Sequence, residues 1–265
     1  STAIRMNTFI QDGGLAGRDV AEANAWGVAP SLAFGLGTDT RLILQYAHVE
    51  RRGVPDSGVS FNRGGDGIWI GGAGINTNRS GTGSRDTFFG RSTDFDDVNA
   101  DTFTARLEYD IAPGVTISNQ TRWAEINREA RYHFASQPTI AAAPESYYDR
   151  TNESFYNQTN LAARFSTGVF RHTVSAGVEF SREKADALRF DNNSGPTPPV
   201  IERSDVTIDT TAVYLYDTIE LSKKWQVVGG LRVEHYDLDL AGDGLLGGPR
   251  FSDSDVTVGG KVGVI

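Results

Sequence analysis

The sequence predicts an all-β fold, an antiparallel up-and-down transmembrane β-barrel, on the basis of three observations. Apolar and polar residues alternate over long stretches, as expected when a strand sorts its side chains between two environments. Several of these stretches exceed the roughly five or six residues that are usual for strands of soluble proteins. Short and long connections alternate along the chain, which in a barrel places the short turns on one rim and the long loops on the other.

The clearest hairpin covers residues 99–133. Residues 102–111 alternate strictly between polar and apolar, and the tight turn Ala112-Pro113-Gly114 follows at once. Proline fixes its own φ and glycine is conformationally permissive, so this tripeptide is a strong turn signal. The second arm then continues to the end of the hairpin without another breaker. A tilted strand needs about 9 to 11 residues to cross a bilayer, and both arms are long enough.

About ten strands are expected, each bounded by glycine, proline or a polar cluster. They cover about 2–11, 25–36, 40–51, 99–111, 115–133, 149–166, 169–184, 206–220, 224–240 and 254–265. The short turns between them lie at 37–39, 112–114, 166–168 and 222–224. The long polar segments lie at about 12–24, 52–98, 134–148, 185–205 and 241–253. Every second connection is therefore short, as in outer-membrane barrels.

The facing of the strands follows from their charged residues. An arginine or lysine on the lipid face at mid-membrane costs about 2 to 4 kcal/mol, so Arg106, Arg171 and Arg232 are expected to point inward. Aromatic residues near the short turns are expected to form an interfacial girdle. They are Phe34, Tyr109, Phe165, Phe170 and Trp225.

The strand expected over 206–220 is the least clear, because it is apolar on both faces. A change of register by one residue would move every side chain to the opposite face. The charge of Asp217 favours placing this residue inward, with Tyr214 and Tyr216 facing lipid.

The composition excludes several classes of protein. The chain has 265 residues, a net charge of −9 and no cysteine. No apolar run approaches about 18 residues, which excludes a membrane-spanning helix. An acidic chain is not expected to bind nucleic acid, and the lack of cysteine rules out disulfide bonds and thiol chemistry. A soluble all-β sandwich or propeller is the alternative fold, because alternation occurs in any half-buried sheet.

Six segments carry a resemblance to a known family. They are 24–37 (NAWGVAPSLAFGLG), 54–59 (VPDSGV), 85–90 (RDTFFG), 101–108 (DTFTARLE), 176–181 (AGVEFS) and 217–222 (DTIELS). In this order and at these spacings they resemble the barrel region of TonB-dependent siderophore receptors, particularly the catecholate-receptor branch. The resemblance spreads over nearly the whole chain.

The resemblance implies a barrel of about 22 strands around a globular plug, in the outer membrane of a Gram-negative bacterium. It implies import of a ferric siderophore, with energy passed from a TonB-type inner-membrane complex through the plug region. The expected partners are the ferric siderophore, outer-membrane lipid and that complex, with no resident cofactor and no enzymatic activity. Residues 1–265 are expected to be one barrel segment, with the plug domain and the C-terminal strands absent.

The longest loop, residues 52–98, is the expected ligand-facing segment because it mixes arginine and aromatic residues with glycine. Guanidinium groups pair with an anionic ferric chelate, and aromatic rings stack on its flat faces. The candidate ligand-binding residues, from this loop and the next long one, are Arg85, Phe88, Phe89, Arg91, Tyr147 and Tyr148. The bland alternative is that these side chains only order the loops against the barrel rim.

Two other functions stay open. A passive porin would use inward arginine and carboxylate side chains as a charged constriction. An outer-membrane protease of about ten strands would need a histidine and an aspartate that converge at the rim to activate water. His133 with Asp149, and His235 with Asp237, are the candidate pairs.

Three further patterns are not expected to mark functional sites. Residues 242–247 match G-x-G-x-x-G, but a strand and not a helix is expected after them. The aspartates within 94–97 and 237–243 lack the spacing of an EF-hand loop. The four histidines lie on different strands without an H-x-x-x-H pair, so no zinc site is expected.

Overall fold

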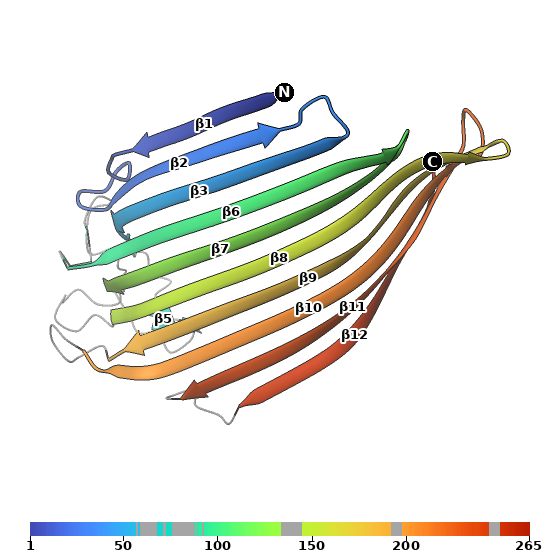
Figure 1. The fold of residues 1–265 in the computed structure, drawn as a ribbon. Helices are drawn as coiled ribbons and strands as arrows, with labels where there is room; N and C mark the ends of the chain where they lie inside the picture. The colour runs from blue at the N-terminus through green and yellow to red at the C-terminus, as the bar shows by residue number, and fades with distance from the viewer. Residues whose placement is uncertain are drawn as a thin grey trace.

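The structure is a computed structural model, and all regular elements among the residues it describes are strands. It describes residues 1–56, 58, 68–70, 73–75, 88, 90–91, 93–133, 145–191, 198–243 and 250–265. Within these residues ten strands form one antiparallel sheet, in which each strand pairs with its neighbours along the chain. The sheet is a long curved meander (Figure 1). No helix in the described part of the chain is long and apolar enough to cross a membrane.

The strands of the large sheet are β1 (Thr2–Gln11), β2 (Glu22–Phe34), β3 (Thr40–Val54), β6 (Phe95–Ala112), β7 (Val115–His133), β8 (Glu145–Thr167), β9 (Phe170–Phe190), β10 (Val200–Glu220), β11 (Gln226–Asp243) and β12 (Phe251–Val264). A separate small hairpin contains β4 (Ile68–Ile70) and β5 (Ala73–Ile75). In the described residues β1 and β12 are the edges of the large sheet and do not pair with each other. The predicted antiparallel up-and-down architecture is confirmed, and within this chain it takes the form of an open curved sheet.

Most strands extend further toward the long loops than their patterns predict. The predicted ranges 2–11 and 115–133 coincide with β1 and β7. In contrast, β9 continues to Phe190 and β10 already begins at Val200. The predictions ended where the apolar alternation ended, whereas backbone pairing with neighbouring strands carries the ladder onward. The β4–β5 hairpin was not foreseen, because it lies inside a segment that was predicted to be a loop.

The short turns all lie at one end of the sheet, together with both chain termini (Figure 1). Gly114 and Gly168 sit in two of these turns with φ angles of 80° and 62°. Side chains with a Cβ rarely adopt this left-handed conformation, so glycine is required for such tight connections. The predicted positions of the turns are confirmed, and the long connections lie at the opposite end.

One face of the sheet is apolar. Leu107, Val178, Leu215 and Leu231 lie on it, and between 47% and 60% of the surface of each is exposed. No element of the described chain packs against this face. Burying each such side chain against hydrocarbon gains about 1.5 to 3 kcal/mol, so a lipid environment stabilises the sheet. We call the other face, which carries Arg106, the polar face.

Aromatic rings border the apolar face at two heights. Phe165 and Phe170 flank the β8–β9 turn and form the lower aromatic row. Phe155 and Phe180 lie ten positions further along the same strands and form the upper aromatic row. Ten residues of strand span about 33 Å, or about 25 Å along the barrel axis at a tilt of about 40°. This matches the height of the apolar band in outer-membrane barrels. We call the region between the two aromatic rows the membrane band.

The predicted facing of β10 is wrong. Tyr214 and Tyr216 lie on the polar face, over Gly177 of β9 and Gly230 of β11, where a Cβ would collide with their rings. The Tyr214 hydroxyl donates a hydrogen bond to Asn160 Oδ1 at 3.0 Å. Glycines on neighbouring strands therefore make room for both rings, and the sequence of β10 alone does not reveal this.

Asp217, whose charge suggested the opposite register, lies on the apolar face. His172 Nδ1 is 2.6 Å from Asp217 Oδ2, and the imidazole stacks on Phe165 with ring centroids 4.9 Å apart. The carboxylate is therefore paired at the lower aromatic row, close to the turn. The prediction assumed the cost of an isolated charge at mid-membrane. A paired charge near the membrane interface costs far less.

Candidate ligand-binding site

The strands continue well beyond the upper aromatic row. β8 and β9 each run ten residues past Phe155 and Phe180 toward the long loops, a region that we call the loop-side extension. At its far end, arginine and tyrosine side chains gather on the polar face of β7, β8 and β9. We call this group the rim cluster, and its members are Arg128, Tyr132, Tyr148, Arg150 and Arg189.

Tyr148 is at the centre of the rim cluster. The guanidinium carbons of Arg128 and Arg150 lie 5.4 Å and 5.8 Å from the centroid of its ring. Tyr132 meets the same ring edge-on, with centroids 6.3 Å apart. Strand pairing explains this arrangement, because Arg150 is opposite Arg128 and Arg189 is opposite Tyr148. Cation–π attraction helps to hold the two guanidinium groups beside one aromatic ring.

Asp96 of β6 fixes the position of Arg128. Arg128 Nε and Nη2 donate hydrogen bonds to the two carboxylate oxygens of Asp96, both at 2.8 Å. Arg51 of β3 donates a third hydrogen bond to the same carboxylate at 2.9 Å. The Asp96 side chain is only 16% exposed. A bidentate pair shielded in this way holds the plane of the guanidinium group, so Arg128 is oriented before any ligand arrives.

The rim cluster and its immediate partners carry a net positive charge. Four arginines meet two carboxylates, which leaves a net charge of +2 in a chain whose total is −9. These residues are Arg51, Arg128, Arg150 and Arg189 against Asp96 and Glu202. Guanidinium groups bind paired anionic oxygens such as those of carboxylates, catecholates and phosphates. The local charge therefore favours a flat or chelating anion.

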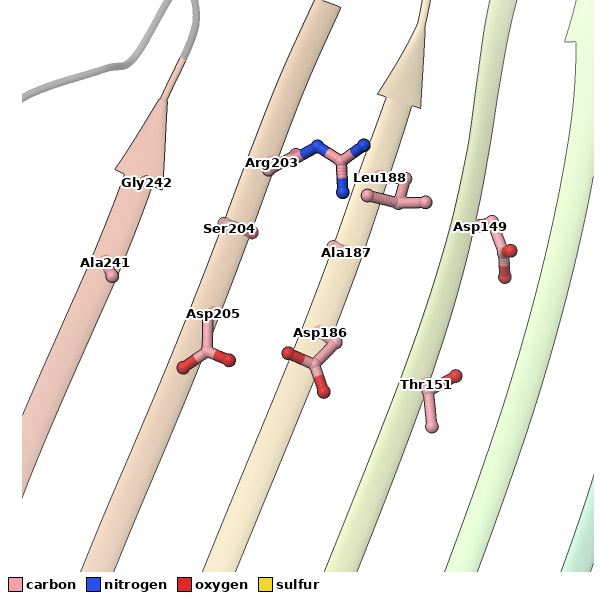
Figure 2. Close-up of a pocket in the computed structure, with 10 residues that line it drawn as sticks. All are labelled: Asp149, Thr151, Asp186, Ala187, Leu188, Arg203, Ser204, Asp205, Ala241 and Gly242. Carbon is pink, nitrogen blue, oxygen red and sulfur yellow. The ribbon is translucent and has the colours of Figure 1, made fainter. Parts of the chain in front are cut away.

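A hollow lies on the opposite side of the loop-side extension from the rim cluster, on the face that continues the apolar face of the membrane band. It has a volume of about 590 Å³ and spans β8 to β11 (Figure 2). Asp186 and Asp205 lie side by side on paired strands, Asp149 adds a third carboxylate, and Arg203 is the cation of the lining. The excess of carboxylates repels an anion, so the rim cluster is the better candidate for an anionic ligand.

Consecutive residues Tyr147 and Tyr148, both predicted to bind ligand, lie on opposite faces of β8. Tyr147 stacks on Phe190 with centroids 4.3 Å apart, and its hydroxyl donates a hydrogen bond to Glu129 Oε1 at 2.5 Å. Side chains alternate along a strand, so two neighbours cannot face one ligand in the barrel interior. The structure brings Tyr148 into the rim cluster and places Tyr147 outside it.

The described residues of the predicted loop site are anchored near the end of β7. Arg91 donates its backbone N–H to Asp94 Oδ2 at 2.9 Å, and His133 Nδ1 lies 2.6 Å from Asp94 Oδ1. The Phe88 ring packs so closely on Gly90 that a Cβ there would collide with it. Asp94 and His133 are both buried, which fixes this end of the loop. The other two predicted loop residues, Arg85 and Phe89, lie outside the described residues.

Sequence reasoning missed four members of the rim cluster. Arg128, Tyr132, Arg150 and Arg189 belong to strands, whereas the search for ligand-binding residues was confined to the long loops. A signal was available, because Arg128 and Tyr132 share one parity on β7 while Tyr148 and Arg150 share one parity on β8. Continuing the alternation of β7 and β8 beyond the membrane band would have placed these four side chains together on the polar face.

The chain matches known proteins along most of its length. The family model described as TonB dependent receptor-like, beta-barrel covers residues 26–265. The chain belongs to the TonB-dependent receptor family. The catecholate siderophore receptor Fiu of Escherichia coli (strain K12) is 35% identical over 267 residues, covering 89% of this chain and 35% of that receptor. The probable TonB-dependent siderophore receptor PiuA of Acinetobacter baumannii is 26% identical over 259 residues, covering 83% of this chain and 34% of the relative.

Solved structures of TonB-dependent receptors share the fold. The closed form of the ferric-catecholate import receptor Fiu from E. coli K12 has a TM-score of 0.78 at 28% identity, covering 99% of this chain and 43% of that one. The siderophore receptor PiuA from A. baumannii has a TM-score of 0.81 at 23% identity, covering 99% and 43%, and shows the fold alone. The chain spans about a third of the length of the curated relatives it matches.

Membership of the TonB-dependent receptor family places the sheet in the outer membrane of a Gram-negative bacterium. The apolar face then meets lipid, and the polar face lines the barrel interior. The family consists of receptors and transporters, not enzymes, and supports the receptor interpretation over a passive porin. The rim cluster accordingly lies on the inner wall, toward the extracellular loops.

The histidine and aspartate residues considered for a protease site do not face the barrel interior. His133 pairs with Asp94, and both His133 and Asp149 lie on the face opposite the rim cluster. His235 Nε2 is 3.1 Å from Asp237 Oδ2, but both side chains are exposed on the outside of the barrel. Within the described ranges, no group of three or more histidine, aspartate or glutamate side chains could hold a metal ion. These residues are more simply explained as structural pairs of a receptor.

Proposed function

We propose that this chain forms part of the substrate-binding wall of an outer-membrane receptor that imports a ferric siderophore of the catecholate type. The observation that carries the proposal is the rim cluster, with its net positive charge and its aromatic centre on the inner wall. A ferric catecholate is an anion with flat aromatic rings, which suits both features. Relatives support the choice, because Fiu is named a catecholate siderophore receptor.

In this proposal Arg128 and Arg150 contact the anionic oxygens of the chelate, and Tyr148 orients both guanidinium groups. The predicted loop residues Arg85, Phe88, Phe89 and Arg91 would supply further arginine and aromatic contacts to the chelate. Tyr147 would act only indirectly, by packing the loop end of β8 against Phe190. The iron is cargo and not a resident cofactor.

Transport also requires energy. The name of the family supports coupling to a TonB-type complex, and this contact would be made by parts of the protein other than the rim cluster. The role of the present chain is therefore recognition of the chelate, which comes before any step driven by energy.

The proposal is tested by titrating a ferric catecholate into the full-length receptor and its Arg128→Ala and Arg150→Ala variants. Each variant removes charged hydrogen bonds, so we expect affinity to fall by about tenfold or more. Arg171→Ala is the matched control, because Arg171 lies on the same polar face at the turn end and pairs with Glu220 at 2.5 Å. Equal affinity of all three variants and the wild type would refute the proposal.

A further inference from the structure

A groove that combines aliphatic side chains with the polar residues Asn152, Ser154 and Glu183 lies directly below the rim cluster on the polar face. Its walls include Ile126 of β7, Ala185 of β9, and Val206 and Ile208 of β10, and its volume is about 260 Å³. Ile126 is 42% exposed, so the groove is open to the barrel interior. In the membrane band the same face carries charged and amide groups, and an aliphatic lining here is therefore a local exception. We call it the aliphatic groove.

The aliphatic groove and the rim cluster form one continuous surface. Ile126 precedes Arg128 by two residues on β7, and Asn152 of the groove follows Arg150 by two residues on β8. Two residues of strand span about 6.6 Å. A molecule seated on the guanidinium groups therefore reaches the groove without moving.

Size and charge indicate what the aliphatic groove can hold. Pockets for whole drug-sized ligands measure about 300 to 1,000 Å³, so a groove of about 260 Å³ fits one arm of a ligand. Glu183 lines the groove opposite Ile208, at the end farther from the rim cluster, and repels a second anionic group. The surface thus favours an anion above and an uncharged, apolar group below.

We infer that the aliphatic groove binds an uncharged, apolar arm of the same ferric chelate whose anionic core binds the rim cluster. This inference rests on the proposed function and narrows the substrate class to catecholate-type chelates that carry a hydrocarbon substituent. Each methylene group buried in the groove strengthens binding about fourfold. The arm enters the barrel first, with the anionic core behind it.

A residue of the neighbouring strand β11 serves as a control that distinguishes a bound ligand arm from a polypeptide covering the groove. Leu240 of β11 lies opposite Val206 in the same row of the polar face and is 37% exposed, but it is not part of the groove. A polypeptide packed along the row would cover Leu240 and Ile126 alike. A ligand arm would contact only the groove.

The experiment compares two probes of equal charge, ferric catecholate and ferric 4-butylcatecholate, titrated into the full-length receptor in lipid nanodiscs. The wild type is expected to bind the butyl probe about tenfold more tightly, or better. Ile126→Asn, and the nearly isosteric Val206→Thr, are expected to remove most of this preference while affinity for ferric catecholate stays within about twofold. Leu240→Asn is expected to keep the preference.

Two results would overturn the inference: equal affinity of the wild type for both probes, or an equal loss of preference in Leu240→Asn and Ile126→Asn. The second result would assign the row to a covering polypeptide. Arg128→Ala, measured in the same titration, separates this inference from the proposed function. Weaker binding of both probes by that variant upholds the rim cluster whatever the groove does, and unchanged binding refutes the rim cluster itself.

Discussion

The same strands carry opposite side-chain patterns in the membrane band and in the loop-side extension. On one face of β9, Val178 and Phe180 meet lipid, while Lys184 and Asp186 follow on the same face above the upper aromatic row. The period of two continues without a break. What changes is the medium outside the barrel, which is hydrocarbon in the band and water above it.

The inner wall shows the reverse change. In the membrane band it carries a polar network in which Arg232 pairs with Glu179 and Glu234. In the extension it becomes aliphatic at Ile126 and Val206, and then basic at the rim cluster. Hydrophobicity therefore indicates the lipid side only between the aromatic rows. Above them this rule no longer holds, because Ile126 and Val206 face the interior while Phe190 lies on the outer face.

The largest expected effect is the loss of membrane assembly when a charge is placed on the apolar face of the membrane band. Leu107→Arg exposes a guanidinium group to hydrocarbon and is expected to block membrane assembly, at a cost of about 2 to 4 kcal/mol. Thr104→Arg lies on the polar face of the same strand and is expected to be tolerated. The amount of folded receptor in the outer-membrane fraction reports both. Equal assembly of the two variants would contradict the assignment of the faces.

A smaller effect, on local amide exchange, tests whether the loop-side extension and the membrane band unfold separately. Asp94→Ala removes the hydrogen bonds that Asp94 accepts from the backbone N–H groups of Arg91 and His133, and is expected to cost about 1 to 3 kcal/mol locally. Amide exchange at Arg91 and His133 should accelerate by about tenfold or more, while exchange in the membrane band stays unchanged. Asp97→Ala is the control, because Asp97 is only partly buried and pairs with Arg52 at 3.3 Å. Equal acceleration throughout the sheet would show that the two regions unfold as one unit.

The smallest effect concerns Asp56, beyond the end of β3. Arg18 donates hydrogen bonds to both of its oxygens, and this contact holds the pKa of Asp56 below its usual value. The contact therefore stabilises the loops above the usual pKa of aspartate and is lost as pH falls through the lowered value. Exposed pairs contribute about 0 to 1 kcal/mol.

We expect the amide of Arg18, which bonds Leu15 O at 3.0 Å, to keep its exchange protection from about pH 7 to about pH 4 and to lose part of it at lower pH. Asp56→Asn should lower this protection over the whole range and leave membrane assembly unaffected. A loss of protection already near neutral pH in the wild type would mean that another group controls this contact.

Much of the fold could be predicted because the membrane imposes a simple rule on each strand. Alternation located the strands, and the turn at Gly114 and the facing of Arg106 were correct. The facing of Tyr214 was wrong, because the space for its ring comes from Gly177 on another strand. Such compensation between strands cannot be read from one strand at a time.

Less of the candidate site could be predicted. Arg128 and Arg150 are far apart in the sequence and become opposite neighbours only through the register of β7 and β8. Tyr148 was identified for its residue type, and Tyr147 was included because alternation was not extended that far along β8. The candidate ligand-binding positions lie above the upper aromatic row, where water replaces lipid outside the barrel and an apolar side chain no longer marks the outer face.

The most direct test of this account is a single-cysteine scan along β9. Residues 1–265 contain no cysteine, and any cysteine elsewhere in the full-length receptor is first replaced by serine. Each position from 170 to 190 is labelled with a fluorophore in the full-length receptor, and quenching by nitroxide lipids is measured. The account predicts strong quenching at even positions from 170 to 180, and none at even positions from 182 onward. Lipid quenching that continues past 182, or that moves to odd positions, would contradict it.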